Sequence, residues 1–208
     1  MRPEQAAFAV VMAAWGVLGA MLVRARIRAR RGDDGAAAGN GARLRDLASW
    51  GGIVLQGLGF SLAFGARRPP GSALLPFIAT PTVEWVFALL VMLLAVASTA
   101  FAGWALRTLD KQWSLTARVR ADHALVTHGP FAHVRHPIYT ALLGLLVATG
   151  LACADGRALL LAVVVYLAGT VWRADREERL LRGMFGAAYD AYAARVPRLL
   201  PSLRPRAP

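Results

Sequence analysis

The sequence has 208 residues, of which 57% are hydrophobic and 17% are charged. An ordinary soluble domain carries about 25% charged residues, so this composition excludes a soluble enzyme, a disordered chain and a collagen-like fibre. The formal net charge is +12. Cys153 is the single cysteine, and one cysteine cannot form an intramolecular disulfide or a cysteine-built zinc site.

Five apolar windows contain no Asp, Glu, Lys or Arg. They are Ala6–Val23, Leu47–Ala66, Trp85–Leu106, Pro137–Ala154 and Ala158–Trp172. A membrane core of about 30 Å requires roughly 20 apolar residues in a helix. The fifth window is short, and we expect its helix to continue past Trp172, where arginine side chains reach the membrane surface. The sequence therefore predicts an all-α integral membrane protein with about five transmembrane helices.

The placement of the basic residues predicts how these helices are oriented. Twenty of the 24 basic residues fall between windows one and two, between windows three and four, or after window five. The four on the other side are Arg2, Arg67, Arg68 and Arg157. Because cytoplasmic loops accumulate Lys and Arg, we expect the N-terminus outside and the C-terminus in the cytoplasm. This explanation of the charge requires no nucleic-acid partner.

The second window is unusual in its glycines and in one polar residue. Gly51, Gly52, Gly57 and Gly59 predict close packing against another helix. Gln56 lies near the middle of the window, where it either lines a substrate cavity or makes an interhelical hydrogen bond. The second role is the commoner one for an intramembrane polar residue.

Residues 155–157 alone separate the last two windows, which predicts a tight antiparallel helical hairpin. Such a hairpin brings its two ends together, so Arg135–Tyr139 should lie near Arg173–Glu178. Pro137 suits the first position of a helix, and we expect the fourth helix to begin there. Its start, with free backbone N–H groups around Ile138–Thr140 and with Arg135 beside it, is a natural site for a carboxylate or phosphate.

The segment after the fifth window carries oppositely charged residues four positions apart, which favours a helix. The pairs are Arg173/Glu177, Asp175/Arg179 and Glu178/Arg182. They form either a solvated, salt-bridged helix end or part of a site for a zwitterion. In the second case Arg135 would take the carboxylate of the ligand and the glutamates its ammonium or hydroxyl groups.

The four histidines of the chain, at positions 123, 128, 133 and 136, precede the fourth window. Their spacing offers no helical pair four residues apart, and positions 133 and 136 straddle a predicted junction of loop and helix. Metal sites need a ligand geometry that this spacing does not supply, so we expect no metal.

Two motifs flank the hairpin. The first, from His123 to Tyr139, has the pattern His-x-Leu-Val-Thr-x-Gly-Pro-Phe-x-x-Val-Arg-His-Pro-x-Tyr. The second comprises Arg173, Glu177-Glu178, Leu181, Phe185-Gly186, Tyr189, Tyr192 and Val196-Pro197. In this order they resemble the signature of the isoprenylcysteine carboxyl methyltransferase family and its phospholipid methyltransferase relatives, over about residues 110–201. Where the family often has an aromatic-Arg-aromatic run, this sequence has Phe131-Ala132-His133. The missing arginine removes a basic contact, and this difference bears on recognition of the substrate head group.

The resemblance implies an integral membrane enzyme that uses S-adenosylmethionine, with the cofactor site at the cytoplasmic ends of the last helical hairpin. Carried over from the family, the cofactor-binding positions are His123, Leu125, Val126, Gly129, Arg135, His136, Pro137, Tyr139 and Glu178. The resemblance places Arg173 and Glu177 toward the substrate, as the catalytic candidates.

The predicted function is methyl transfer from S-adenosylmethionine to a small lipophilic or membrane-embedded carboxylate, thiol or amine. The alternatives are a membrane reductase of the sterol-reductase type that uses NADPH, and a non-catalytic membrane protein of the same fold. We expect a three-span N-terminal region, 1–106, and a methyltransferase region, 107–208. Because Lys111 is the single lysine, the composition indicates a GC-rich genome and hence a bacterial inner membrane, with membrane lipids as neighbours. The oligomeric state does not follow from the sequence.

Overall fold

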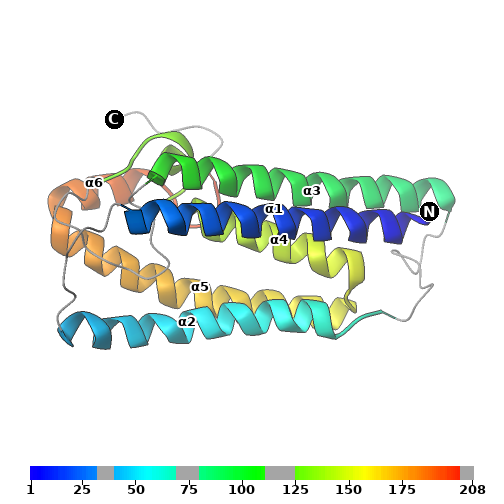
Figure 1. Cartoon of the computed structure of the whole chain (residues 1–208), viewed down its shortest axis with the longest axis horizontal. Coiled ribbons are helices and arrows are strands. Elements are labelled where there is room, and N and C mark those ends of the chain that lie inside the picture. The colour runs from blue at the N-terminus through cyan, green and yellow to red at the C-terminus, as the bar shows by residue number, and fades with distance from the viewer. Residues whose placement is uncertain (32–39, 69–79, 111–124, 202–208) are drawn as a thin grey trace.

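The structure is a computed structural model that describes residues 1–31, 40–68, 80–110 and 125–201. Five long helices lie side by side and alternate in direction (Figure 1). They are α1 (Pro3–Arg31), α2 (Asn40–Gly65), α3 (Pro81–Leu109), α4 (Pro137–Cys153) and α5 (Gly156–Phe185). A 3-10 turn, η2 (Gly129–Ala132), precedes α4, and a short helix, α6 (Ala187–Arg195), follows α5. All the named elements in these ranges are helical, so the predicted all-α fold is confirmed.

Each apolar window corresponds to one long helix, and most of the helices extend beyond their windows into polar sequence. As predicted, α4 begins at Pro137 and α5 continues past Trp172. By length and composition, α1 over Pro3–Ala29, α3 and α5 are suited to cross a membrane. The apolar part of α2 (Trp50–Gly65) and all of α4 are shorter. Three of the five expected spans are therefore of full length, and two are short.

The hairpin between α4 and α5 is as tight as the sequence predicts. Helix α4 ends at Cys153 and α5 begins at Gly156. The Asp155 carboxylate accepts a hydrogen bond from the Arg157 backbone N–H at 2.9 Å, which caps the start of α5. This turn makes the two helices antiparallel neighbours and brings the start of α4 and the end of α5 to the same end of the bundle (Figure 1).

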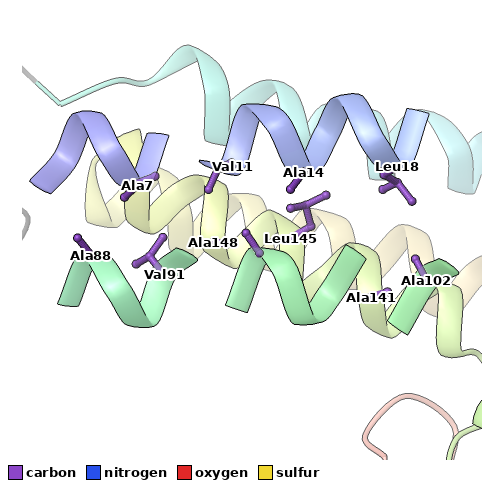
Figure 2. Close-up of a cluster of buried hydrophobic side chains, with 12 residues drawn as sticks. Ala7, Val11, Ala14, Leu18, Ala88, Val91, Ala102, Ala141, Leu145 and Ala148 are labelled. Carbon is purple, nitrogen blue, oxygen red and sulfur yellow. The ribbon is translucent and has the colours of Figure 1, made fainter. Parts of the chain in front are cut away.

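Helices α1, α3 and α4 share an interface built mainly from alanine. Figure 2 shows the side chains of these three helices pointing toward one another. On α3 the alanines of this cluster recur every seven residues, at positions 88, 95 and 102. Small residues let helix backbones approach closely, which is how helices associate where lipid removes the hydrophobic driving force. The cluster comprises Ala7, Val11, Ala14, Leu18, Ala88, Val91, Ala95, Ala102, Ala141, Leu145, Ala148 and Ala152.

Helix α2 packs along α5, a pairing that Figure 1 shows for most of their length. A Cβ added to Gly59 would lie 2.8 Å from the Ala162 carbonyl oxygen, and one added to Gly52 would lie 2.4 Å from Cγ of Arg173. A Cβ on Gly57 would meet nothing within 4 Å. The predicted close packing is therefore confirmed for Gly52 and Gly59 and is wrong for Gly57, which faces away from α5.

We expect Gly59→Ala to destabilise the protein and Gly57→Ala to leave it unchanged or slightly more stable. Both changes raise helix propensity by up to about 1 kcal/mol. At Gly59 the new methyl group also meets the α5 backbone, and overpacking of this kind costs about 1–3 kcal/mol. Thermal unfolding of the two purified variants in the same detergent measures the difference. Equal midpoints would contradict the close approach of α2 and α5.

One end of the bundle gathers the ends of α1, α3 and α5 and the starts of α2 and α4 (Figure 1). Helix α6 and the described C-terminal residues lie at this same end. It is the end that the sequence assigns to the basic segments and the two motifs.

Candidate functional site

The start of α4 is covered by the C-terminal segment, residues 196–201. The backbone N–H groups of Arg135 and His136 donate to the carbonyls of Pro197 at 2.9 Å and Arg198 at 3.2 Å. The Thr140 hydroxyl lies 2.6 Å from the Leu199 carbonyl, and the Thr140 N–H donates to the His136 carbonyl at 3.1 Å. The expectation of free N–H groups at the helix start is therefore wrong for Thr140, because the α-helical hydrogen bond already begins there.

His136 is held between two carboxylates of α5. Its Nε2 lies 3.1 Å from Oε1 of Glu178, and its Nδ1 lies 3.5 Å from Oε2 of Glu177. A neutral imidazole has one N–H, whereas the imidazolium directs one toward each carboxylate. Burial by itself lowers the pKa of His136, but the hydrogen bonds with Glu177 and Glu178 outweigh it, so the pKa is raised above its usual value.

Glu178 is the centre of the ionic network and is 3% exposed. Arg198 makes a two-pronged contact with it, Nε to Oε1 at 3.0 Å and Nη2 to Oε2 at 3.1 Å, and also pairs with Asp175. Nη2 of Arg135 lies 3.6 Å from Oε1 of Glu178. Arg198 was not among the residues predicted from the sequence, although it directly follows the Val196-Pro197 motif.

Arg173 lies under the α4 start and is 8% exposed. Its guanidinium carbon lies 5.0 Å from the centre of the Tyr139 ring, and its Nη2 lies 3.8 Å from Oε1 of Glu177. The Tyr139 hydroxyl donates to the same Glu177 oxygen. From α2, the Gln56 side-chain carbonyl accepts from Nη1 of Arg173 at 2.9 Å. Gln56 also donates to the Thr170 hydroxyl at 2.8 Å, so its predicted interhelical hydrogen bond is confirmed.

One interpretation of the sequence was that the charged end of α5 is a solvated, salt-bridged helix. The structure agrees with this interpretation only in part. The Arg173–Glu177 and Glu178–Arg182 pairs occur, at 3.8 and 4.0 Å. The Asp175 carboxylate pairs instead with the C-terminal segment, and Arg179 donates to the Asp175 backbone carbonyl at 3.1 Å. The solvated reading is wrong for the buried members of the segment, because they face the start of α4.

The remaining residues named from the sequence lie around this centre. Gly129 has φ +63°, and a Cβ there would lie 3.0 Å from Oγ1 of Thr108 on α3, so this turn requires glycine. Leu125 packs against the cluster of Tyr189, Tyr192 and Val196. Val126 is half-buried in the irregular segment before η2, and Pro137 is buried at the first position of α4. His123 lies outside the described residues.

The structure thus brings together six of the residues named from the sequence, at one end of the α4–α5 hairpin. They are Arg135, His136, Tyr139, Arg173, Glu177 and Glu178. Desolvating so many ionised groups is costly even when they are paired, so their concentration beside membrane helices is characteristic of a functional site. Adjacent guanidinium and carboxylate groups can bind a ligand that carries both charges.

Residues 89–183 match a family model described as the isoprenylcysteine carboxyl methyltransferase (ICMT) family. A search of solved structures gave the eukaryotic intramembrane Ras methyltransferase ICMT, at 19% sequence identity and a TM-score of 0.46. That comparison covers 78% of this chain and 54% of the Ras methyltransferase chain, so this chain spans about half the length of that protein. No curated protein matches the sequence. The six gathered residues lie inside the matched range, so the part of the chain that holds the site is similar to the isoprenylcysteine carboxyl methyltransferase family.

Proposed function

We propose that the protein is an S-adenosylmethionine-dependent methyltransferase that acts on a lipophilic acceptor at the cytoplasmic membrane face. The observation that carries the proposal is the buried ionic cluster between the start of α4 and the C-terminal part of α5, which lies within the part of the chain that matches the family model. The acceptor is a small or membrane-embedded carboxylate, thiol or amine.

The residues of this ionic cluster fit the amino-acid portion of S-adenosylmethionine, which carries both an ammonium and a carboxylate. Arg135 is positioned to take the carboxylate, while Glu178 takes the ammonium. The two side chains already lie 3.6 Å apart, so they offer opposite charges over the span of an amino acid. The other proposed cofactor contacts, from the resemblance, are His123, Leu125, Val126, Gly129, His136, Pro137 and Tyr139.

When bound, S-adenosylmethionine would supply a methyl group on positively charged sulfur: an acceptor atom would form a bond to the methyl carbon in line with the C–S bond, which would break and release neutral S-adenosylhomocysteine. The protein's contribution to such a reaction is mainly orientation and exclusion of water. Arg173 orients the polar head of the acceptor, and the guanidinium of Arg173 stacks on the Tyr139 ring. Glu177 holds Arg173 and the Tyr139 hydroxyl in place, and it receives the proton when the acceptor atom carries one.

A radiolabel-transfer assay on the purified protein tests the proposal. Labelled S-adenosylmethionine would be supplied with dodecanoic acid, dodecanethiol, dodecylamine and N-acetyl-S-farnesylcysteine in turn. We expect methylation of at least one acceptor and binding of S-adenosylmethionine but not NADPH. Binding of NADPH alone would favour the reductase, and binding of S-adenosylmethionine with no transfer to any acceptor would favour a non-catalytic membrane protein.

The proposed membrane arrangement has five spans, with residues 1–106 as a three-span region and 107–208 as the methyltransferase region. It follows from the five alternating helices and from the basic residues expected in the cytoplasm. Under this arrangement the α4–α5 site faces the cytoplasm of a bacterial cell, where S-adenosylmethionine is made. The acceptor enters sideways from the lipid.

Reporter fusions test this arrangement. We expect a reporter fused after Pro208 to be cytoplasmic and one inserted near Pro70 to be periplasmic, because the Arg-rich segments remain inside. Paired alkaline phosphatase and fluorescent-protein fusions at each position report the two locations with opposite signals. Both reporters on the same side of the membrane would contradict the five-span arrangement.

A further inference from the structure

Two residues of helix α2 accommodate the Arg173 side chain. Gly52 and Gln56 are one helical turn apart on α2, and both contact this arginine. At Gly52 the missing side chain leaves room for the aliphatic stem of Arg173, because a Cβ there would lie 2.4 Å from its Cγ. At Gln56 the side-chain carbonyl receives Nη1 of the guanidinium at 2.9 Å. One residue therefore admits the stem and the other fixes the charged head.

The orientation of the Gln56 amide is determined by its two partners. A guanidinium only donates hydrogen bonds, so the oxygen of the amide must face Arg173. The amide nitrogen then donates to the Thr170 hydroxyl at 2.8 Å, on the same face of α5 as Arg173. Gln56 is 6% exposed and Thr170 is fully buried. Since both ends of the amide are engaged in a buried setting, the guanidinium is held in one position.

Gln56 fixes the arginine without neutralising it. The carboxylate of Glu177 lies farther from Arg173, at 3.8 Å, and also serves Tyr139 and His136. A neutral amide supplies a directional contact and leaves the positive charge of the guanidinium to act on a bound molecule. An additional carboxylate at the same position would compete for that charge.

We propose that Gln56 is a positioning residue that aims Arg173 at the methyl acceptor, so that α2 forms part of the acceptor side of the site. This inference rests on the proposed function. It extends the functional machinery to a helix that lies outside the region matched by the family model, residues 89–183. It also distinguishes the acceptor side from the cofactor side, where Arg135 lies in the segment before α4 and Glu178 lies on α5.

The test is Gln56→Met, which keeps the length of the side chain and removes both polar contacts. The assay uses the full-length protein in detergent and whichever of the four compounds in the radiolabel-transfer assay is methylated. We expect turnover of that acceptor to fall about 10- to 100-fold, because a wrongly positioned Arg173 no longer orients it. The Kd for S-adenosylmethionine, measured by calorimetry, should remain within about twofold. The same substitution in an Arg173→Leu background should cause no further loss of turnover, since the residue that it positions is already gone.

Thr149→Val is the matched control. Trp15 of α1 donates to the Thr149 hydroxyl at 3.0 Å, so this change removes another interhelical hydrogen bond, which is partly buried and lies far from Arg173. We expect a similar loss of thermal stability with wild-type turnover.

Near-wild-type turnover of Gln56→Met would overturn the inference while leaving the proposed function intact, and so would an equal loss in the Arg173→Leu background. A parallel weakening of S-adenosylmethionine binding would reduce Gln56 to a structural role. A wild-type protein that methylates no acceptor fails the proposed function, and the inference falls with it.

Discussion

Arg173→Leu is expected to reduce turnover about 100-fold or more while binding of S-adenosylmethionine remains nearly normal. The leucine keeps an apolar stem against Gly52, so the packing of α2 on α5 is preserved. Glu177 keeps its contacts with Tyr139 and His136, so the carboxylate is not left without a partner. What is lost is the guanidinium that we propose to orient the acceptor, and excess cofactor should not restore the rate.

Steady-state kinetics with each substrate varied in turn distinguish this outcome from a general defect. Arg179→Leu is the matched control, because Arg179 is an exposed arginine on the same helix whose guanidinium contacts the Asp175 backbone carbonyl. We expect this control to retain wild-type turnover. If Arg173→Leu were as active as the wild type, Arg173 would have a structural role alone, and the proposed acceptor site would be wrong.

Glu178→Gln is expected to weaken S-adenosylmethionine binding and to destabilise the fold. The carboxylate lies among Arg135, His136 and Arg198, and it is nearly inaccessible to solvent. An amide of the same shape leaves these cations without their shared anion, and breaking a buried ion pair costs about 3–5 kcal/mol. Activity should return partly at high S-adenosylmethionine concentration, because a ligand that binds the folded state also stabilises it.

The control for this change is Asp190→Asn, which removes a carboxylate that pairs with Arg182 at the exposed surface, at 3.0 Å. Exposed pairs contribute little, so we expect its stability to change by less than about 1 kcal/mol and its cofactor affinity to be unaltered. Calorimetric titration and thermal unfolding measure the two quantities separately. Unchanged affinity in a folded Glu178→Gln protein would assign this glutamate to structure alone and remove it from the cofactor site.

Most of the fold can be predicted from the local sequence. Hydropathy locates all five long helices because an apolar run of such length has few other stable conformations. The proline at position 137 marks a helix start through its own backbone chemistry, and in the structure α4 begins there. The approach of Arg135–Tyr139 to Arg173–Glu178 also follows from the sequence, because a tight hairpin must join its own ends.

Tertiary structure alone decided which faces meet and which partners close the site. Hydropathy is similar around a membrane helix, so the sequence does not separate Gly59, which contacts α5, from Gly57, which does not. Gln56 and Arg173 are 117 positions apart, and Arg198 reaches Glu178 from a segment beyond α6. No periodicity links such positions, because their distance is set by how α2 and the C-terminal segment pack on α5. The sequence by itself therefore determined the helices and the side chains that the two motifs bring to one end of the hairpin, whereas packing between distant segments selected the residues that hold those side chains in place.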